Sequence, residues 1–168
     1  MKVMEHAHFG RVETSALDGT DVVWESTSQL GDDEVEVQLW AGPSSDPDAE
    51  ELDAFAACLT DLSALDTAAR TALRAYLRED RCFIDYHVEE LEDSETVVRL
   101  VRDAADEAVG ADSFAAAMRL SSVGLWLSGL SDGPPVILDY MVDPELSDQI
   151  LAVKLTRDGT VVSVDWES

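Results

Sequence analysis

The chain has 168 residues, of which 36 are Asp or Glu and 11 are Lys or Arg, so its formal net charge is −25 and 46% of it is hydrophobic. This apolar content can form a core, which excludes disordered and fibrous classes, and the length suits one domain over residues 1–168. The acidic charge repels phosphates and the basic residues are scattered, so we expect no nucleic-acid partner.

The N-terminal run from Met1 to His8 contains charges and histidines where a secretion signal needs an unbroken apolar stretch. No window reaches the roughly 18 apolar residues of a membrane-spanning helix. We therefore expect a cytoplasmic protein with no membrane partner. Cys58 and Cys82 lack the spacing of a zinc or redox motif, so we interpret both as core or helix-flank residues.

Alternating apolar and polar residues predict strands in the first third of the chain. The clearest case is the segment in which Val35, Val37 and Leu39 alternate with acidic or amide side chains. The residues before and after it include Gly and Asp, which favour turns. The expected N-terminal strands or hairpin arms cover residues 3–13, 20–25 and 33–40.

Helical spacing of apolar residues begins near residue 46. Asp46 followed by Pro47 is typical of an N-cap and a first helical residue, so we expect a helix to start there. Asp66 is expected to cap a second helix, and Gly110 is expected to end a third. The expected helices are one from Pro47, one over residues 67–92, one from Ser94 and a short one over residues 112–118.

After Leu120 the hydrophobic period returns to two, and Asp158-Gly159 predicts a hairpin turn with positive φ at the glycine. The closing two strands should therefore be antiparallel. Strands at both ends with helices between them predict an α+β fold: a largely antiparallel sheet built from N-terminal and C-terminal strands, with three to four central helices packed on it. The expected C-terminal strands are 123–127, 136–142, 150–155 and 161–166.

The opening run from Met1 to Gly10 and the closing run from Asp158 to Ser168 resemble a bacterial family, domain-of-unknown-function family 2004. The strand at 35–40 and the segment from Leu52 to Asp66 are also similar, so the resemblance spans almost the whole chain. It implies a compact acidic bacterial domain. Its motifs are not catalytic signatures, so it implies no functional residues.

The histidines provide one candidate site. His6 and His8 are two positions apart, so in a strand both point to one face, where Glu5 or a distant carboxylate could complete a divalent metal site. Two histidines alone fall short of a closed tetrahedral site. His87 lies on an apolar helical stripe, so we expect a hydrogen-bonded core residue there.

Two tryptophans provide the second candidate site. Trp40 and Trp126 fall on the strand faces opposite to their apolar neighbours. If both rings are exposed, they form a patch suited to binding a partner, because tryptophan is enriched at interface hot spots. The alternative is a sheet that is covered on both faces.

The sequence contains no GxSxG, HExxH, GxxxxGK[ST] or GxGxxG motif, and no cofactor is expected. The acidic excess has two explanations that stay open, a generally solvated surface or a surface that selects a partner protein with a basic surface. The leading expectation is a non-catalytic protein-interaction domain, immunity-like or regulatory. The alternative is a small metal-binding protein or enzyme that uses His6 and His8 with nearby carboxylates.

The net charge predicts that salt stabilises the protein. We expect the melting temperature to rise when potassium chloride is added, because the Debye length falls to about 10 Å at about 0.1 M and the carboxylates then repel one another less. Thermal unfolding across a salt series checks this. A melting temperature that is flat or falls over the first few tenths molar contradicts the expectation.

Overall fold

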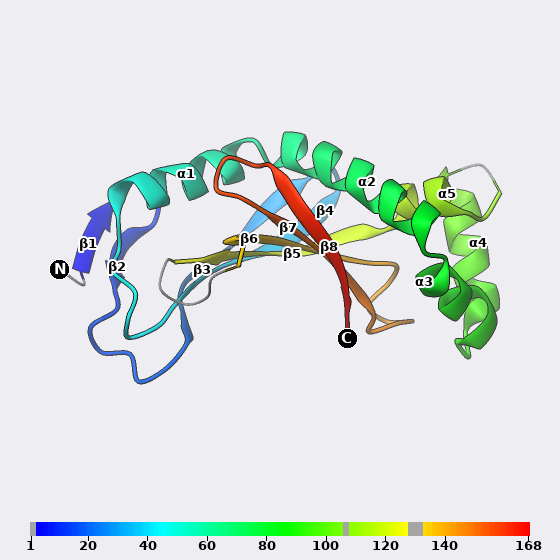
Figure 1. Ribbon diagram of the computed structural model, residues 1–168, viewed down its shortest axis with the longest axis horizontal. Coiled ribbons are helices and arrows are strands. Elements are labelled where there is room, and N and C mark those ends of the chain that lie inside the picture. Colours follow the sequence, from blue (N-terminus) through cyan, green and yellow to red (C-terminus); the bar gives the residue numbers. More distant parts are fainter. Residues whose placement is uncertain (1–2, 106–107, 128–132) are drawn as a thin grey trace.

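The computed structural model describes residues 3–105, 108–127 and 133–168. They form an α+β fold with a two-stranded hairpin and a six-stranded sheet of order β3-β4-β5-β6-β7-β8 (Figure 1). The strands are β1 (Val3–His6), β2 (Gly10–Glu13), β3 (Asp21–Leu30), β4 (Asp33–Ala41), β5 (Arg119–Trp126), β6 (Val136–Met141), β7 (Ile150–Leu155) and β8 (Val161–Glu167). The helices are α1 (Ala49–Thr60), α2 (Leu62–Glu79), α3 (Cys82–Asp85), the π-helical η1 (Tyr86–Glu90), α4 (Ser94–Ala105) and α5 (Ala111–Ala117).

The helices cover one face of the sheet. α1 and α2 form an arc above it, and α3, α4 and α5 gather at one end (Figure 1). On the opposite face, which we call the open face, no helix lies among the described residues. None of the described helices combines the length and the apolar character needed to cross a membrane.

The core lies between the helices and the sheet. Val35, Val37 and Leu39 of β4 are fully buried, whereas Glu34 and Glu36 on either side of Val35 are exposed, so the predicted alternation is confirmed. The other elements contribute large apolar side chains to the same cluster. The largest of these buried side chains include Phe55, Phe83, Phe114, Leu73 and Tyr140.

The sheet is mostly antiparallel, as predicted, but one pair of strands departs from this pattern. β4 and β5 are parallel, with Trp40 paired to Trp126. All the described helices lie between these two strands in the chain and return it to the end of the sheet where β4 begins, so β5 runs in the same direction. The closing β7–β8 hairpin is antiparallel as predicted, and Gly159 in its turn has a φ of 89°.

The N-terminal hairpin requires a second correction. Among the described residues, β1 pairs with β2 alone and the two form their own sheet beside α1. Residues 3–13 are therefore a hairpin, but they do not extend the main sheet. Phe9 and Val12 are buried and attach the hairpin to the core. The six-stranded sheet begins instead with β3, at residue 21.

Helix starts differ from the sequence prediction because other aspartates are used. Asp48 rather than Asp46 caps α1, and its carboxylate accepts a hydrogen bond from the backbone N–H of Glu50 at 2.8 Å. Asp66 does not cap a helix. It lies within α2, which starts five residues earlier than expected, and its carboxylate contacts other side chains.

The predicted long helix over residues 67–92 is interrupted. Asp80 has an extended backbone and ends α2, and its carboxylate accepts a hydrogen bond from the backbone N–H of Cys82 at 2.9 Å. A short α3 and the π-helical η1 follow. Gly110 precedes α5 as its N-cap rather than ending the third helix, and the short helix expected near 112–118 is confirmed as α5.

A polar network joins α2, α5 and β6. The guanidinium of Arg70 donates to the Asp66 carboxylate at 3.0 Å and to the carbonyl oxygens of Ala115 and Met118 at 2.6 and 2.8 Å. The fully buried Tyr140 donates its hydroxyl hydrogen to Asp66 at 2.6 Å. Burial and the neighbouring Asp66 raise the pKa of Tyr140, so its hydroxyl stays protonated. Arg70 thus provides hydrogen-bond donors for carbonyl groups at the C-terminal end of α5, which have no partner within the helix.

His87 is a core histidine, as the sequence predicted. It is fully buried, and its ring nitrogens lie 2.7 Å from the carbonyl oxygen of Phe83 and 2.8 Å from the hydroxyl of Ser147. Burial lowers the pKa of His87, although the hydrogen bond to the Phe83 carbonyl opposes this. The folded protein therefore holds a neutral imidazole there.

We predict that His87 makes the protein less stable as the pH falls. The unfolded chain takes up a proton near the ordinary histidine pKa, whereas the folded chain takes it up only at lower pH, so stability is lost as pH falls through this interval. The free energy of unfolding of wild type minus that of His87→Gln should decrease by about 1 kcal/mol between about pH 7.5 and 5.5. Urea unfolding of both proteins measures this difference, and a difference that is constant with pH contradicts the prediction.

Candidate functional site on the open face of the sheet

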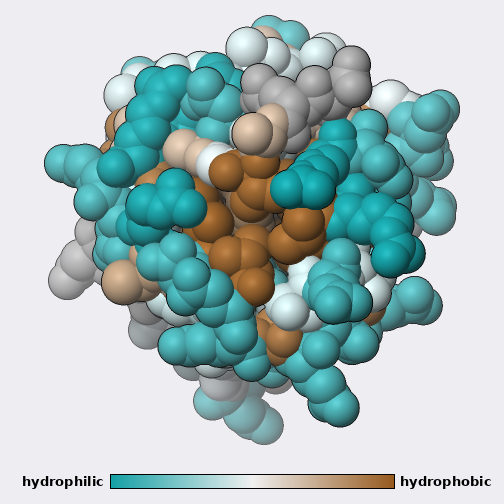
Figure 2. All heavy atoms as spheres, turned by 90° about the vertical axis from the view of Figure 1, so that its right-hand side faces the viewer, coloured by the Kyte–Doolittle hydropathy of each residue, from teal (hydrophilic) through white to brown (hydrophobic). Residues whose placement is uncertain are grey.

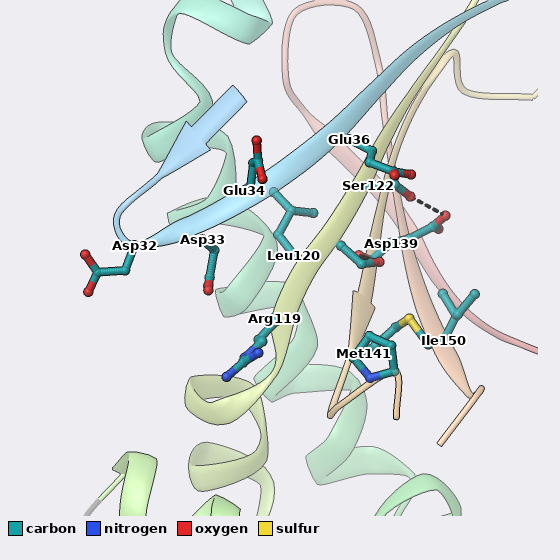
Figure 3. Close-up of a pocket in the computed structure, with 12 residues that line it drawn as sticks. Asp32, Asp33, Glu34, Glu36, Arg119, Leu120, Ser122, Asp139, Met141 and Ile150 are labelled. Atoms are coloured by element: carbon teal, nitrogen blue, oxygen red, sulfur yellow. Dashed lines mark hydrogen bonds between the residues drawn. The ribbon is translucent and has the colours of Figure 1, made fainter. Parts of the chain in front are cut away.

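The open face contains a cleft of about 640 Å³, which we call the open-face cleft (Figure 3). The β3–β4 turn, β4, β5, β6, β7 and the loop after β6 contribute to it. Five of its described lining residues are carboxylates and one is arginine. The lining residues are Asp32, Asp33, Glu34, Glu36, Arg119, Leu120, Ser121, Ser122, Asp139, Met141, Pro144 and Ile150.

A row of polar side chains across three strands lines part of the cleft. The register of β4, β5 and β6 places Glu36 beside Ser122 and Ser122 beside Asp139. The Ser122 hydroxyl donates a hydrogen bond to Asp139 at 3.1 Å (Figure 3). Burial raises the pKa of Asp139 and the nearby Glu167 raises it further, while the hydrogen bond from Ser122 lowers it. A cation next to Asp139 would stabilise its charged form.

Trp40 and Trp126 stack on one another on this face. Their ring centroids are 5.1 Å apart and their planes differ by 8°, and both residues are half-buried. The parallel pairing of β4 and β5 brings them side by side. Both lie on the strand face opposite to the core, as predicted, and no described helix covers that face. Their role in binding a partner stays a prediction.

Gly124 makes room for this stack. A Cβ atom at position 124 would lie 3.0 Å from Nε1 of Trp126, closer than ordinary packing allows. The indole of Trp126 therefore lies close to the strand backbone at Gly124. In the sequence, the signal for this contact is the spacing of two residues between Gly124 and Trp126, which places both on one face of the strand.

The stacked rings form one wall of a smaller cavity of about 210 Å³, which we call the indole pocket. It shares Ser122 and Asp139 with the open-face cleft, so the two are adjacent. Lys154 also lines it, with its ammonium 3.2 Å from Asp165 and 3.6 Å from Glu167. The lining residues are Gln38, Trp40, Ser122, Gly124, Trp126, Ile137, Asp139, Lys154 and Glu167.

The two N-terminal histidines do not share a strand face, because β1 ends at His6 and His8 lies in the following turn. Nε2 of His6 is 2.7 Å from the Asp53 carboxylate, and Nδ1 of His6 accepts a hydrogen bond from the backbone N–H of His8 at 3.1 Å. The ring of His8 packs against Phe9 and Trp24. Within residues 3–105, 108–127 and 133–168, no group of three or more His, Cys, Asp or Glu side chains is placed to hold a metal.

The cysteines occupy the kinds of positions that the sequence predicted. Cys58 is buried, and Cys82 is exposed at the first residue of α3. Burial raises the pKa of the Cys58 thiol, and a hydrogen bond to Asp80 raises that of Cys82. Neither thiol therefore has the lowered pKa of a reactive cysteine.

Carboxylates are also exposed on the helical layer, for example at Glu50, Glu79 and Glu90. Their presence on both layers agrees with a generally solvated acidic surface. At the end of the molecule that carries α3, α4 and α5, apolar side chains gather at the surface inside a hydrophilic surround (Figure 2). The open face differs from the helical layer because it combines carboxylates with a stacked indole pair.

No protein-family model, curated protein or solved structure matches the chain. Neither Ser122 nor Asp139 stands out in the sequence, because serines and carboxylates are numerous in this chain. Strand register, which a single sequence does not specify, brings them together.

Proposed function

We propose that this protein is a non-catalytic interaction domain, immunity-like or regulatory, whose open face binds a protein with a basic surface. The observation that carries the proposal is the stacked pair of Trp40 and Trp126 among carboxylates on a sheet face that no described helix covers. A cytoplasmic location and membership of domain-of-unknown-function family 2004 are part of the proposal.

The electrostatics of the open face support a basic partner. The carboxylates of the open-face cleft outnumber its single arginine, and the overall charge of −25 attracts a basic protein over long range. The indoles add apolar area that can be desolvated at the centre of an interface. Protein interfaces typically have a polar rim and a core enriched in aromatic side chains. On the open face, the carboxylates could select the partner by charge and the two indoles could bury apolar area against it.

A pair of charge-reversal variants tests the proposal. Glu34→Lys with Glu36→Lys alters the open face, and Glu79→Lys with Glu90→Lys makes the same change in net charge on the helical layer. All four side chains are exposed, so folding should persist. Wild type and the helical-layer variant should capture the same basic protein from the host, and its affinity for the open-face variant should be about tenfold or more lower.

The captured protein should then be purified and its association rate measured against salt. We expect the rate to fall steeply as salt increases, because the charges steer the encounter. Equal affinity of the partner for both variants contradicts the proposal. The proposal is also contradicted if no captured basic protein binds the two variants with different affinities.

A further inference from the structure

The indole pocket has walls that suit one type of side chain. The flat rings of Trp40 and Trp126 line it together with the carboxylates of Asp139 and Glu167. Its volume of about 210 Å³ is far smaller than that of the open-face cleft, so it suits a single side chain rather than a segment of chain. We propose that the indole pocket binds an arginine side chain of the basic partner, with the guanidinium near the indoles and Asp139. This inference rests on the proposed function and names the anchor of the interaction.

The charge of the pocket favours one additional cation. Asp139 and Glu167 contribute two negative charges, and Lys154 contributes one positive charge. The ammonium of Lys154 is held between Asp165 and Glu167. The carboxylate of Asp139, by contrast, accepts a hydrogen bond from the Ser122 hydroxyl, and that is the one side-chain donor to this carboxylate among the described residues. A bound guanidinium would supply further donors to this carboxylate.

The lining of the pocket, two indoles beside a carboxylate, favours arginine over lysine. A planar guanidinium can stack on an indole and donate two parallel hydrogen bonds to a carboxylate, whereas an ammonium is compact and more strongly hydrated. The chain already uses this combination elsewhere. The guanidinium of Arg70 lies 5.4 Å from the ring centroid of Tyr140 while it donates to Asp66.

The test uses the full chain and Nα-acetyl-L-arginine amide as the probe. Binding is followed by NMR through the indole N–H signals of Trp40 and Trp126, with Trp24 and Trp166 as internal references. We expect saturable shifts of the first two signals with low millimolar affinity. The lysine analogue and the neutral citrulline analogue should bind at least about fivefold more weakly.

Three variants test whether the arginine probe binds in the indole pocket. Asp139→Asn should weaken arginine binding about fivefold or more, and Glu79→Gln, which removes the same charge from the helical layer, should leave it unchanged within about twofold. Lys154→Met should strengthen binding by about threefold, because it removes the cation already in the pocket. Stronger binding cannot result from partial unfolding.

Equal effects of Asp139→Asn and Glu79→Gln overturn the inference, and so does a lysine analogue that binds as well as arginine. This result is separable from the partner experiment. If the open-face charge reversal abolishes capture of a basic protein but the arginine probe does not bind, the proposed function stands and the arginine anchor is wrong. If the probe binds in the pocket but no partner distinguishes the two charge-reversal variants, the function is wrong.

Discussion

Replacing Arg70 with alanine is expected to lower the free energy of unfolding by about 3 kcal/mol. The change removes the donor to the carbonyl oxygens of Ala115 and Met118 at the end of α5. It also leaves the Asp66 carboxylate, whose side chain is 17% exposed, with the Tyr140 hydroxyl but without its cation. Both losses leave polar groups in a largely dry environment, and this is the source of the large effect.

Two further variants separate the contributions of Arg70. Arg70→Lys keeps the positive charge but lacks the planar guanidinium that donates several hydrogen bonds at once. It should therefore recover about half of the lost free energy of unfolding. Tyr140→Phe should cost about 1 kcal/mol, because Asp66 keeps its bond to Arg70. As a control, Arg78→Ala removes an exposed pair with Asp112 and should cost about 0.5 kcal/mol or less. Urea unfolding measures all four proteins, and equal losses for Arg70→Ala and Arg78→Ala would refute the account.

Gly124→Val is expected to separate the stacked indoles. An ideal Cβ at position 124 lies 3.0 Å from Nε1 of Trp126, so the indole must shift, and we expect the valine methyl groups to move it away from Trp40. The exciton couplet of the two rings in circular dichroism should disappear, and the stability should fall by about 1–2 kcal/mol. Arginine binding and partner capture should weaken together, because both use the same rings.

The matched control for this variant is Gly19→Val. An ideal Cβ at Gly19 has no atom within 4 Å, so the couplet and the binding should persist there. A retained couplet in Gly124→Val would show that the stack tolerates a side chain beneath it. That outcome would remove the argument that this glycine shapes the indole pocket.

Local pattern predicted most of the secondary structure. The alternation around Val35, Val37 and Leu39 predicted a strand with one buried face, and Asp158-Gly159 predicted the last turn. These features depend on neighbours in the sequence, so a single sequence contains them. Helix boundaries were less predictable. Asp48 rather than Asp46 is the N-cap of α1, Asp61 rather than Asp66 is the N-cap of α2, and Asp80 ends α2. Aspartates are frequent around these helices, and the carboxylate of any of them can accept a hydrogen bond from a backbone N–H.

The candidate site was predicted in part. The sequence indicated that Trp40 and Trp126 point away from the core, but it did not indicate that they touch. For the histidines, the expectation of a shared face failed because β1 ends at His6, and a turn does not keep the two-residue period. Asp139 could not be distinguished from the other carboxylates by composition, since its burial and its bond to Ser122 arise from pairing between strands.

The amino-acid sequence by itself determined the acidic charge, the α+β class, the order of strands and helices, and the face of each strand that carries its large apolar residues. The tertiary structure decided the parallel pairing of β4 with β5, the separate N-terminal hairpin, and the meeting of both indoles with Asp139 on an open face. The physical reason is one of range. The spacing of hydrophobic residues determines the local secondary structure over a few residues, whereas the pairing of strands depends on where the intervening helices place the next strand of the chain.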